Sequence, residues 1–334
     1  MRKSFSFGIL FAHVSEVELM PFGEMKLFTG NSNPKLAHDI CDYLNVSIGK
    51  AQVFKFQNDN TFVKILENVR ERDIFVVQPM SEPVNDSIIE LLIMIDALKR
   101  ASAARITAVL PYFAYGRSDK KDQPRVPITA RLMANLIETA GADRVLTIDL
   151  HAGQIQGFFN IPVDELTAVP MLANTFRDRG IEDLVVVATD VGGAGRARET
   201  AGILNAPIAI MDKRRIGNDD TTATDNLIGD VTDKTAFIID DEISTGGTVV
   251  NTAELVMAHG ARAVYCAATH PVLCGDASKK LNNSPIKEYL FTDTLPVIDG
   301  EMKDKIINVS VAPLLGEAIR RIHSGTSVGE LFAS

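Results

Sequence analysis

Short apolar runs recur along the chain, and longer segments with helical spacing lie between them. Each run is almost continuously hydrophobic and bounded by polar residues, which is typical of a strand covered on both faces. The runs span residues 73–78, 106–112, 144–150, 183–190, 207–213, 235–241 and 263–270. Because strands that alternate with helices form parallel sheets, the pattern predicts an α/β fold in which parallel sheets are flanked by helices.

Two of the intervening segments have the spacing of packing helices. In residues 85–101, Asn85 is the expected N-cap residue. Residues 247–260 form a second candidate helix, which Gly260 is expected to end. One face of this helix is expected to carry Val249, Ala253, Val256 and Met257.

The chain length predicts more than one domain. At 334 residues, it exceeds the size at which a single hydrophobic core usually stops growing. Hydrophobic residues make up 46% of the chain, which suffices for a large core and argues against wholesale disorder. We expect two successive α/β domains, one over residues 1–165 and one over residues 166–309.

Charge and cysteine content narrow the class of protein. The formal net charge of −9 opposes the cationic footprint of a nucleic-acid-binding protein, so no nucleic-acid partner is expected. Cys41, Cys266 and Cys274 lack the spacing of a metal site, and their odd number suits buried thiols in a reducing cytosol. The apolar run 5–14 is followed by acidic residues, which predicts a strand or an extension rather than a secretory signal. No other apolar segment reaches the roughly 20 residues of a bilayer span, so we expect a cytoplasmic protein without a membrane partner.

Polar residues follow several of the expected strands. In open parallel sheets, ligands bind outside the carboxyl ends of the strands, so these positions are the candidates for chemistry. They include Asp149, His151, Asp190, Asp212, Lys213, Arg214, Arg215, Asp240 and Asp241.

The stretch FIIDDEISTGGT, residues 237–248, combines an acidic pair with a glycine-containing turn. A helix that begins near Gly247 would direct backbone N–H groups and the positive end of its dipole at an anion. At the strand end, Asp240 and Asp241 can both accept hydrogen bonds from vicinal hydroxyls. A sugar phosphate satisfies both halves of the stretch. The alternative is a solvated acidic turn before an ordinary helix start.

Residues 240–248 resemble the phosphoribosyl-diphosphate binding loop of phosphoribosyltransferases and ribose-phosphate pyrophosphokinases. From about Lys26 to the C-terminus, the chain is similar to the pyrophosphokinases, notably in residues 29–37, 115–121, 127–159 and 310–325. The resemblance implies two similar phosphoribosyltransferase-type domains, with residues 310–334 packing back on the first, and a homo-hexamer. It also implies that the protein transfers the β,γ-diphosphate of ATP to the anomeric hydroxyl of ribose 5-phosphate, with Mg²⁺ as cofactor.

The resemblance assigns roles to individual residues. Lys213 and Arg215 would stabilise the charge of the transition state, and His151 and Asp190 would hold the metal. Histidine is an unusual ligand for a hard cation, so His151 can instead hydrogen-bond a phosphate. The ribose 5-phosphate site would comprise Arg215, Asp240, Asp241, Ser244, Thr245, Gly246, Gly247 and Thr248. The ATP site would comprise Phe56, Asn58, Asp59, Asn60, Arg117, Ser118 and His151.

Two segments near these residues raise further expectations. Residues 211–226 have neither helical nor strand periodicity, which predicts a closing loop, with a solvated basic patch as the alternative. Residues 56–60, FQNDN, match a family segment that reaches a neighbouring subunit and contacts adenine. Family carboxylates are replaced here by the amides of Asn58 and Asn60, which can turn an oxygen or a nitrogen toward the base. We therefore expect looser selectivity for ATP, unless these asparagines only cap a turn.

Other departures and alternatives stay open at this point. Ser244 replaces an aspartate that relatives usually carry, and Gln52 stands where a serine is frequent, so regulation by ADP and phosphate is not predicted. A phosphoribosyltransferase would consume phosphoribosyl diphosphate and would have no second ATP site. A catalytically silent homologue would instead regulate an active synthetase by co-assembly.

Overall fold

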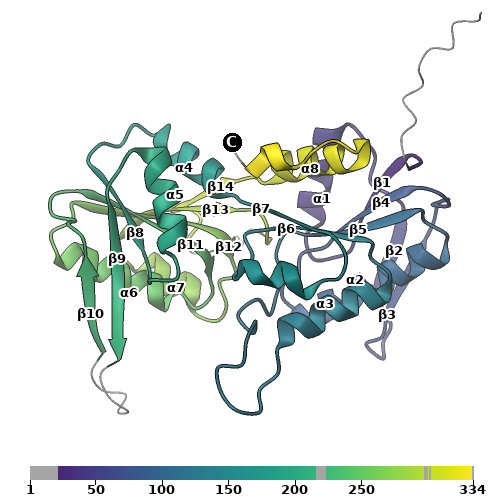
Figure 1. Ribbon diagram of the computed structural model, residues 1–334, viewed down its shortest axis with the longest axis horizontal. Helices are drawn as coiled ribbons and strands as arrows, with labels where there is room; N and C mark the ends of the chain where they lie inside the picture. Colours follow the sequence, from purple (N-terminus) through teal and green to yellow (C-terminus); the bar gives the residue numbers. More distant parts are fainter. Residues whose placement is uncertain (1–21, 216–222, 297–299, 301, 333–334) are drawn as a thin grey trace, which may run out of the picture.

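The computed structural model describes residues 22–215, 223–296, 300 and 302–332. Most of its strands form two sheets that lie side by side (Figure 1). The first sheet is parallel throughout and has the order β1-β4-β5-β6-β7. Its strands are β1 (Met25–Thr29), β4 (Asp73–Val77), β5 (Arg105–Leu110), β6 (Arg144–Ile148) and β7 (Val163–Leu166).

The second sheet has the order β10-β9-β8-β11-β12-β13-β14. The edge pair β9–β10 is antiparallel, and the other neighbouring pairs are parallel. The strands are β8 (Leu184–Ala188), β9 (Ile208–Arg215), β10 (Ala223–Ile228), β11 (Thr235–Ile243), β12 (Ala263–Pro271), β13 (Ile286–Thr292) and β14 (Ile306–Val309). This architecture confirms the expected α/β class with parallel sheets flanked by helices.

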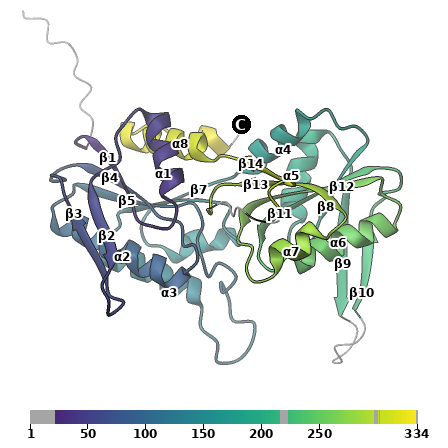
Figure 2. The same cartoon turned by 180° about the vertical axis from the view of Figure 1, so that it is seen from behind.

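A separate antiparallel hairpin, β2 (Ala51–Lys55) with β3 (Thr61–Ile65), packs beside α2. The helices cover both faces of the sheets (Figures 1 and 2). They are α1 (Pro34–Leu44), α2 (Val84–Arg100), α3 (Thr129–Ala140), α4 (Val169–Arg177), α5 (Ala194–Leu204), α6 (Gly247–Ala258), α7 (Ala277–Asn282) and α8 (Ala312–Ser324). Short 3-10 helices span Gly153–Phe158 and Gly329–Phe332.

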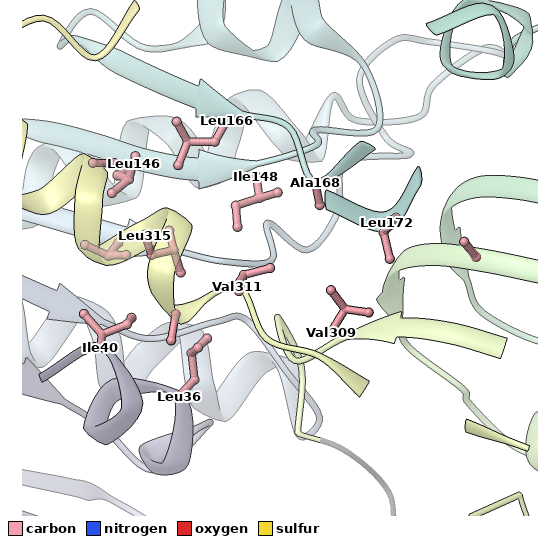
Figure 3. Close-up of a cluster of buried hydrophobic side chains, with 14 of the residues drawn as sticks. Leu36, Ile40, Leu146, Ile148, Leu166, Ala168, Leu172, Val309, Val311 and Leu315 are labelled. Atoms are coloured by element: carbon pink, nitrogen blue, oxygen red, sulfur yellow. The ribbon is translucent and has the colours of Figure 1, made fainter. Parts of the chain in front are cut away.

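Strand residues alternate between two layers of core. Ile74 and Val76 of β4 pack with the helices α2 and α3, whereas Phe75 and Val77 pack on the opposite face with α1 and α8. The second of these layers continues without a break onto the second sheet (Figure 3), where α4 and α5 cover it. A continuous buried layer resists independent movement of the two sheets, because sliding them would expose apolar surface.

Helix α8 is the last long helix of the described chain, yet it lies against α1 beside the first sheet (Figure 2). Gly316 permits the close approach, because a Cβ atom there would lie 2.4 Å from the ring of Tyr43. At the end of α8, the carbonyl oxygen of Ile322 accepts a hydrogen bond from Arg105 Nη2 at 3.0 Å. The bounds of the two domains, at 165/166 and 309/310, stay predictions.

Several local predictions are wrong. Asn85 does not cap α2, because the helix begins at Val84 with Pro83 as its N-cap, and Asn85 Oδ1 instead accepts a hydrogen bond from Tyr115. Residues 211–226 are not irregular throughout, because β9 runs to Arg215 and β10 starts at Ala223. Met257 does not share the buried face of α6, since 37% of it is exposed.

Other predictions fall outside the described residues or concern membranes. The apolar run 5–14 and residues 216–222 of the expected closing loop lie outside the described part of the chain. Within that part, no helix has both the length and the hydropathy needed to cross a bilayer.

Candidate active site

A cavity of about 450 Å³ opens at the carboxyl ends of β8 and β11. Residues that follow β5 and β6 of the first sheet also reach it, so both halves of the molecule contribute to its wall. Among the lining residues are Arg117, His151, Thr189, Asp190, Arg196, Asp240, Asp241, Glu242, Ser244, Thr245, Gly246, Gly247 and Thr248. The predicted phosphate turn and the polar ends of three strands therefore meet at one site.

The turn after β11 leads directly into α6. Gly246 precedes the helix with a φ of 76°, a left-handed conformation that favours glycine, and a Cβ atom there would lie 3.2 Å from Leu281. Because Gly246 is the N-cap residue, no side chain at that position caps the first turn of the helix, and the first helical residues, Gly247 and Thr248, line the cavity. A helix start of this kind suits an anion.

Ser244 fixes the outer side of the same turn. Its backbone carbonyl accepts a hydrogen bond from the amide of Cys274 at 3.1 Å, and its hydroxyl lies 3.1 Å from the Cys274 sulfur. These contacts hold the turn against the loop after β12. The hydroxyl therefore has a protein partner, although Ser244 also lines the cavity.

The acidic pair has partners on three sides. Asp240 accepts hydrogen bonds from Thr189 Oγ1 and from the amide of Asp241, each at 2.9 Å. Asp241 Oδ2 lies 2.7 Å from His151 Nδ1, and Asp241 Oδ1 lies 3.3 Å from Arg196 Nη1. The two carboxylates are thus fixed in place, and their remaining lone pairs can accept hydroxyl protons.

The two carboxyl groups differ in protonation. Burial, with the adjacent charge of Asp241, raises the pKa of Asp240 to about 7. Burial also acts to raise the pKa of Asp241, but the hydrogen bond from His151 and the charge of Arg196 outweigh it and hold that pKa below its usual range. The pair therefore carries between one and two negative charges near neutral pH.

His151 and Asp190 lie on the same cavity, as expected for candidate metal ligands. The hydrogen bond with Asp241 raises the pKa of His151 against the opposing effect of burial. Asp190 Oδ1 accepts the amide hydrogen of Gly193 at 2.8 Å, just before α5. In the described residues, no three His, Cys, Asp or Glu side chains come close enough to hold a metal ion by themselves.

Glu242 and Arg117 form an ion pair across the junction of the two halves. Glu242 Oε1 accepts from Arg117 Nε, and Glu242 Oε2 lies 3.4 Å from the hydroxyl of Tyr112. The side chain of Glu242 is 9% exposed, whereas that of Arg117 is 57% exposed. Arg117 therefore lines the cavity with one of its nitrogens already occupied.

Not every predicted residue lies at this cavity. The turn that carries Phe56, Asn58, Asp59 and Asn60 joins β2 to β3, on the far side of the first sheet from the second sheet (Figure 1). These residues do not line the cavity, and neither does Ser118, whose hydroxyl contacts Thr129 at 3.2 Å. Lys213 and Arg215 lie in β9, and their side chains are outside the described structure.

The sequence motifs did not indicate Thr189, Arg196 and Glu242. Thr189 adjoins the predicted Asp190, and Arg196 lies in the first turn of the helix that follows it, so a helix start after that glycine turn was the available signal. Glu242 lies inside the phosphate motif, and only its contact with the other half distinguishes it from a surface glutamate.

Family models, curated sequences and a solved structure all match this chain to ribose-phosphate pyrophosphokinases. A model of the N-terminal domain of ribose phosphate pyrophosphokinase matches residues 25–141, and a model of the phosphoribosyl synthetase-associated domain matches residues 221–333. A ribose-phosphate pyrophosphokinase from Clostridium acetobutylicum is 52% identical over 310 residues, which cover 92% of this chain and 97% of the relative. One from Bacillus subtilis is 47% identical over 309 residues, which cover 92% and 97% of the two chains. The crystal structure of phosphoribosylpyrophosphate synthetase from Mycobacterium smegmatis matches with a TM-score of 0.86 and 40% identity, covering 91% of this chain and 100% of that chain.

Proposed function

The chain belongs to the ribose-phosphate pyrophosphokinase family, and on that basis we propose that it transfers the β,γ-diphosphate of ATP to ribose 5-phosphate. The observation that carries the proposal is the junction at the end of β11. There, two carboxylates and an open helix start face the same cavity as Arg117 and His151 of the first half. A sugar phosphate and a nucleotide phosphate chain can therefore meet between the two halves.

Ribose 5-phosphate is assigned to the turn over residues 244–248. Its phosphate would accept hydrogen bonds from the backbone N–H groups at the start of α6, and its ring hydroxyls would donate to Asp240 and Asp241. The anomeric oxygen then attacks the β-phosphorus of ATP. The bond from that phosphorus to the bridging oxygen of the α-phosphate breaks, AMP leaves with this oxygen, and the hydroxyl proton passes to solvent.

Charge stabilisation is the main task of the protein groups in such a transfer. We assign Arg117 to the ATP phosphates, and Lys213 and Arg215 to the charge that develops in the transition state. His151 either hydrogen-bonds a phosphate or contributes to a metal site, and Ser118 supports the nucleotide loop. These roles match donors to acceptors, since arginine and lysine carry only donors and phosphate oxygens only accept.

The side chains at the cavity fit an Mg²⁺ ion that is held partly by the protein and partly by substrate phosphates and water. Mg²⁺ retains waters and is bound through one or two carboxylates together with substrate phosphates, so a complete protein cage is not needed. Asp190 would supply the carboxylate, and His151, whose Nδ1 is hydrogen-bonded to Asp241, would have Nε2 available. When bound, Mg²⁺ would neutralise charge on the phosphate oxygens.

The β2–β3 hairpin is assigned to the adenine base of a neighbouring chain. Phe54 and Phe56 are 43% and 49% exposed, and they form an aromatic cluster with Phe62. Because this exposed cluster lies away from its own cavity, we infer that each hairpin serves an adjacent subunit of the homo-hexamer that the family resemblance implies. The proposed substrates of the protein are phosphate esters, which do not cross membranes unaided. For this reason we place the protein in the cytoplasm.

Incubation of the purified chain with ATP, Mg²⁺ and ribose 5-phosphate tests the proposed function directly. We expect AMP and phosphoribosyl diphosphate to form in equal amounts. Lys213→Ala, purified in parallel, is the control against contaminating enzymes and should lose about a hundredfold or more in turnover, the scale of one preorganised electrostatic donor. An assembled wild-type protein that forms no AMP would contradict the proposal and would support a silent homologue.

A further inference from the structure

Glu242 follows the two carboxylates of the ribose-phosphate strand, but its own contacts point away from that site toward the first half. We propose that Glu242 is a positioning residue that fixes the guanidinium of Arg117 for the phosphates of the nucleotide. The inference rests on the proposed function, because it assigns a third carboxylate of the same strand to the donor substrate.

Glu242 is held in one position and contacts the first half of the molecule through both of its carboxylate oxygens. It belongs to β11 of the second sheet, and both of its oxygens contact residues that follow β5 of the first sheet. Oε1 pairs with Arg117 Nε, and Oε2 lies 3.4 Å from the Tyr112 hydroxyl. Tyr112 is itself fixed, since its ring packs against the buried His270 with centroids 5.0 Å apart. The carboxylate is therefore held by strand, burial and a second partner before any ligand arrives.

Arg117 forms its ion pair with Glu242 through Nε, which leaves the two terminal nitrogens of the guanidinium for a ligand. Its ion pair within the described residues is formed through Nε. The terminal nitrogens Nη1 and Nη2 carry four of the five N–H groups of a guanidinium. Within the described residues, neither terminal nitrogen has a hydrogen-bond partner, and the side chain lines the cavity. A planar pair of donors is the arrangement that recognises phosphate oxygens bidentately.

Two opposing effects decide whether Glu242 strengthens or weakens the interaction with the phosphates of ATP. The negative charge of Glu242 repels phosphate, but the arginine that contacts it neutralises that charge locally. Arg117 is 57% exposed, so without its anchor the side chain would occupy many rotamers and lose them on binding. A small misplacement of a group that must meet the transition state costs far more than a screened repulsion. The anchoring effect therefore outweighs the repulsion.

Glu242→Gln is the decisive variant, because it keeps the shape of the side chain and removes the charge that holds Arg117. We expect kcat/KM for ATP to fall about tenfold to a hundredfold, while KM for ribose 5-phosphate changes less than about twofold. Glu67→Gln is the matched control. Glu67 also forms a partly buried ion pair, with Lys26 at 2.7 Å, but it does not line the cavity, and its loss should leave both constants unchanged.

A binding titration with Mg²⁺ and ATP separates positioning from general loss of structure. Glu242→Gln should weaken ATP binding about tenfold in the wild-type background and less than about twofold in an Arg117→Ala background, because its effect passes through Arg117. An equal loss in both backgrounds, an equal rise in KM for both substrates, or tighter ATP binding overturns the inference. If the wild type forms no AMP, the proposed function fails, but this titration still decides the role of Glu242.

Discussion

The three successive carboxylates at the end of β11 show how individual side chains balance charge at the cavity. Asp240 contacts Thr189 of its own half, Asp241 is shared by His151 and Arg196, and Glu242 pairs with Arg117. Each carboxylate has a different set of partners, so this acidic run does not present three unbalanced charges to a phosphate. The balance explains how the site that we propose for two polyanionic substrates can tolerate so many acidic residues.

Asp240→Asn tests the ribose clamp. The variant keeps the shape of the side chain but exchanges a charged acceptor for a neutral amide, and charged hydrogen bonds are the stronger class. We expect KM for ribose 5-phosphate to rise about tenfold and KM for ATP to change less. Steady-state kinetics with each substrate varied in turn measures both. The opposite order would mean that the two substrate sites are exchanged.

The same variant has a defined effect on stability. The pKa of Asp240, raised to about 7, lies above that of an unfolded aspartate at about 3.9, so the native state binds this proton more tightly. Wild-type stability therefore falls as pH rises from about 4 to about 7, and Asp240→Asn removes that loss. Its unfolding midpoint relative to wild type should increase between about pH 4 and pH 7 and level off above that. Asp241→Asn is the control of opposite sign, because the depressed pKa of Asp241 means that its ionised form stabilises the fold.

At this scale, sequence could locate groups that are close along the chain. Asp240, Asp241 and the turn to Thr248 were predictable because one strand end and one helix start create their site. Arg196 and the role of Glu242 were not, because they depend on which groups the fold brings near them. A charged residue one turn into a helix looks the same in sequence whether it meets solvent or a buried carboxylate.

The hairpin β2–β3 is a secondary-structure element that the hydrophobic pattern of the sequence did not identify. Its strands, 51–55 and 61–65, are short and half-exposed, so they lack the continuous hydrophobicity that identified β4, β5 and β6. The turn between them is ordered by its own contacts. Asn58 Oδ1 accepts the amide hydrogen of Asn60 at 3.3 Å, and Lys55 pairs with Asp59 at 2.8 Å. Asn58 thus caps the turn, as the alternative interpretation expects, whereas the side chain of Asn60 has no hydrogen-bond partner within the described residues, so the expected loosening of ATP selectivity rests on Asn60.

Nucleotide selectivity distinguishes these interpretations. We expect ATP to be the preferred donor, with GTP used measurably, because an amide can present either a donor or an acceptor to the base. Combining Asn58→Asp with Asn60→Glu should restore discrimination by about tenfold, the scale of one unpaired buried polar group. The ratio of kcat/KM for ATP and GTP measures this in both proteins. Strict ATP use by the wild type, unchanged in the double variant, rules the idea out.

The whole molecule is organised by a core layer that crosses from one sheet to the other. Phe176 of α4 stacks on Phe237 of β11 with centroids 4.0 Å apart, in the same layer as Leu146 of the first sheet. His270 Nε2, at the end of β12, lies 3.1 Å from the carbonyl oxygen of Ile148. Alternation of strands and helices predicted the class of this fold, because buried parallel strands are apolar throughout. It could not predict strand order or the antiparallel edge β10, which depend on contacts distant in sequence. The return of residues 310–334 to the first domain was expected only from the family resemblance.

Assembly is the property of the whole molecule with the most direct consequence for the site. If each hairpin completes the cavity of an adjacent chain, Phe56→Ala and Lys213→Ala damage different chains of one composite site. Each variant alone should have little activity at limiting ATP. In mixed oligomers formed from equal amounts, about a quarter of the sites would combine an intact hairpin with an intact β9, as random pairing across a subunit interface requires.

Mixed oligomers should therefore recover about a quarter of wild-type activity, although neither variant contributes a whole functional chain. The two proteins are co-expressed with different affinity tags and purified through both, and size-exclusion chromatography with light scattering verifies the assembly. A mixture of the separately assembled variants is the control, since it contains no composite site. Phe56 is 49% exposed, so its loss should leave the fold intact. If the mixed oligomers are no more active than that control, each hairpin serves its own chain or none, and the proposed shared site is wrong.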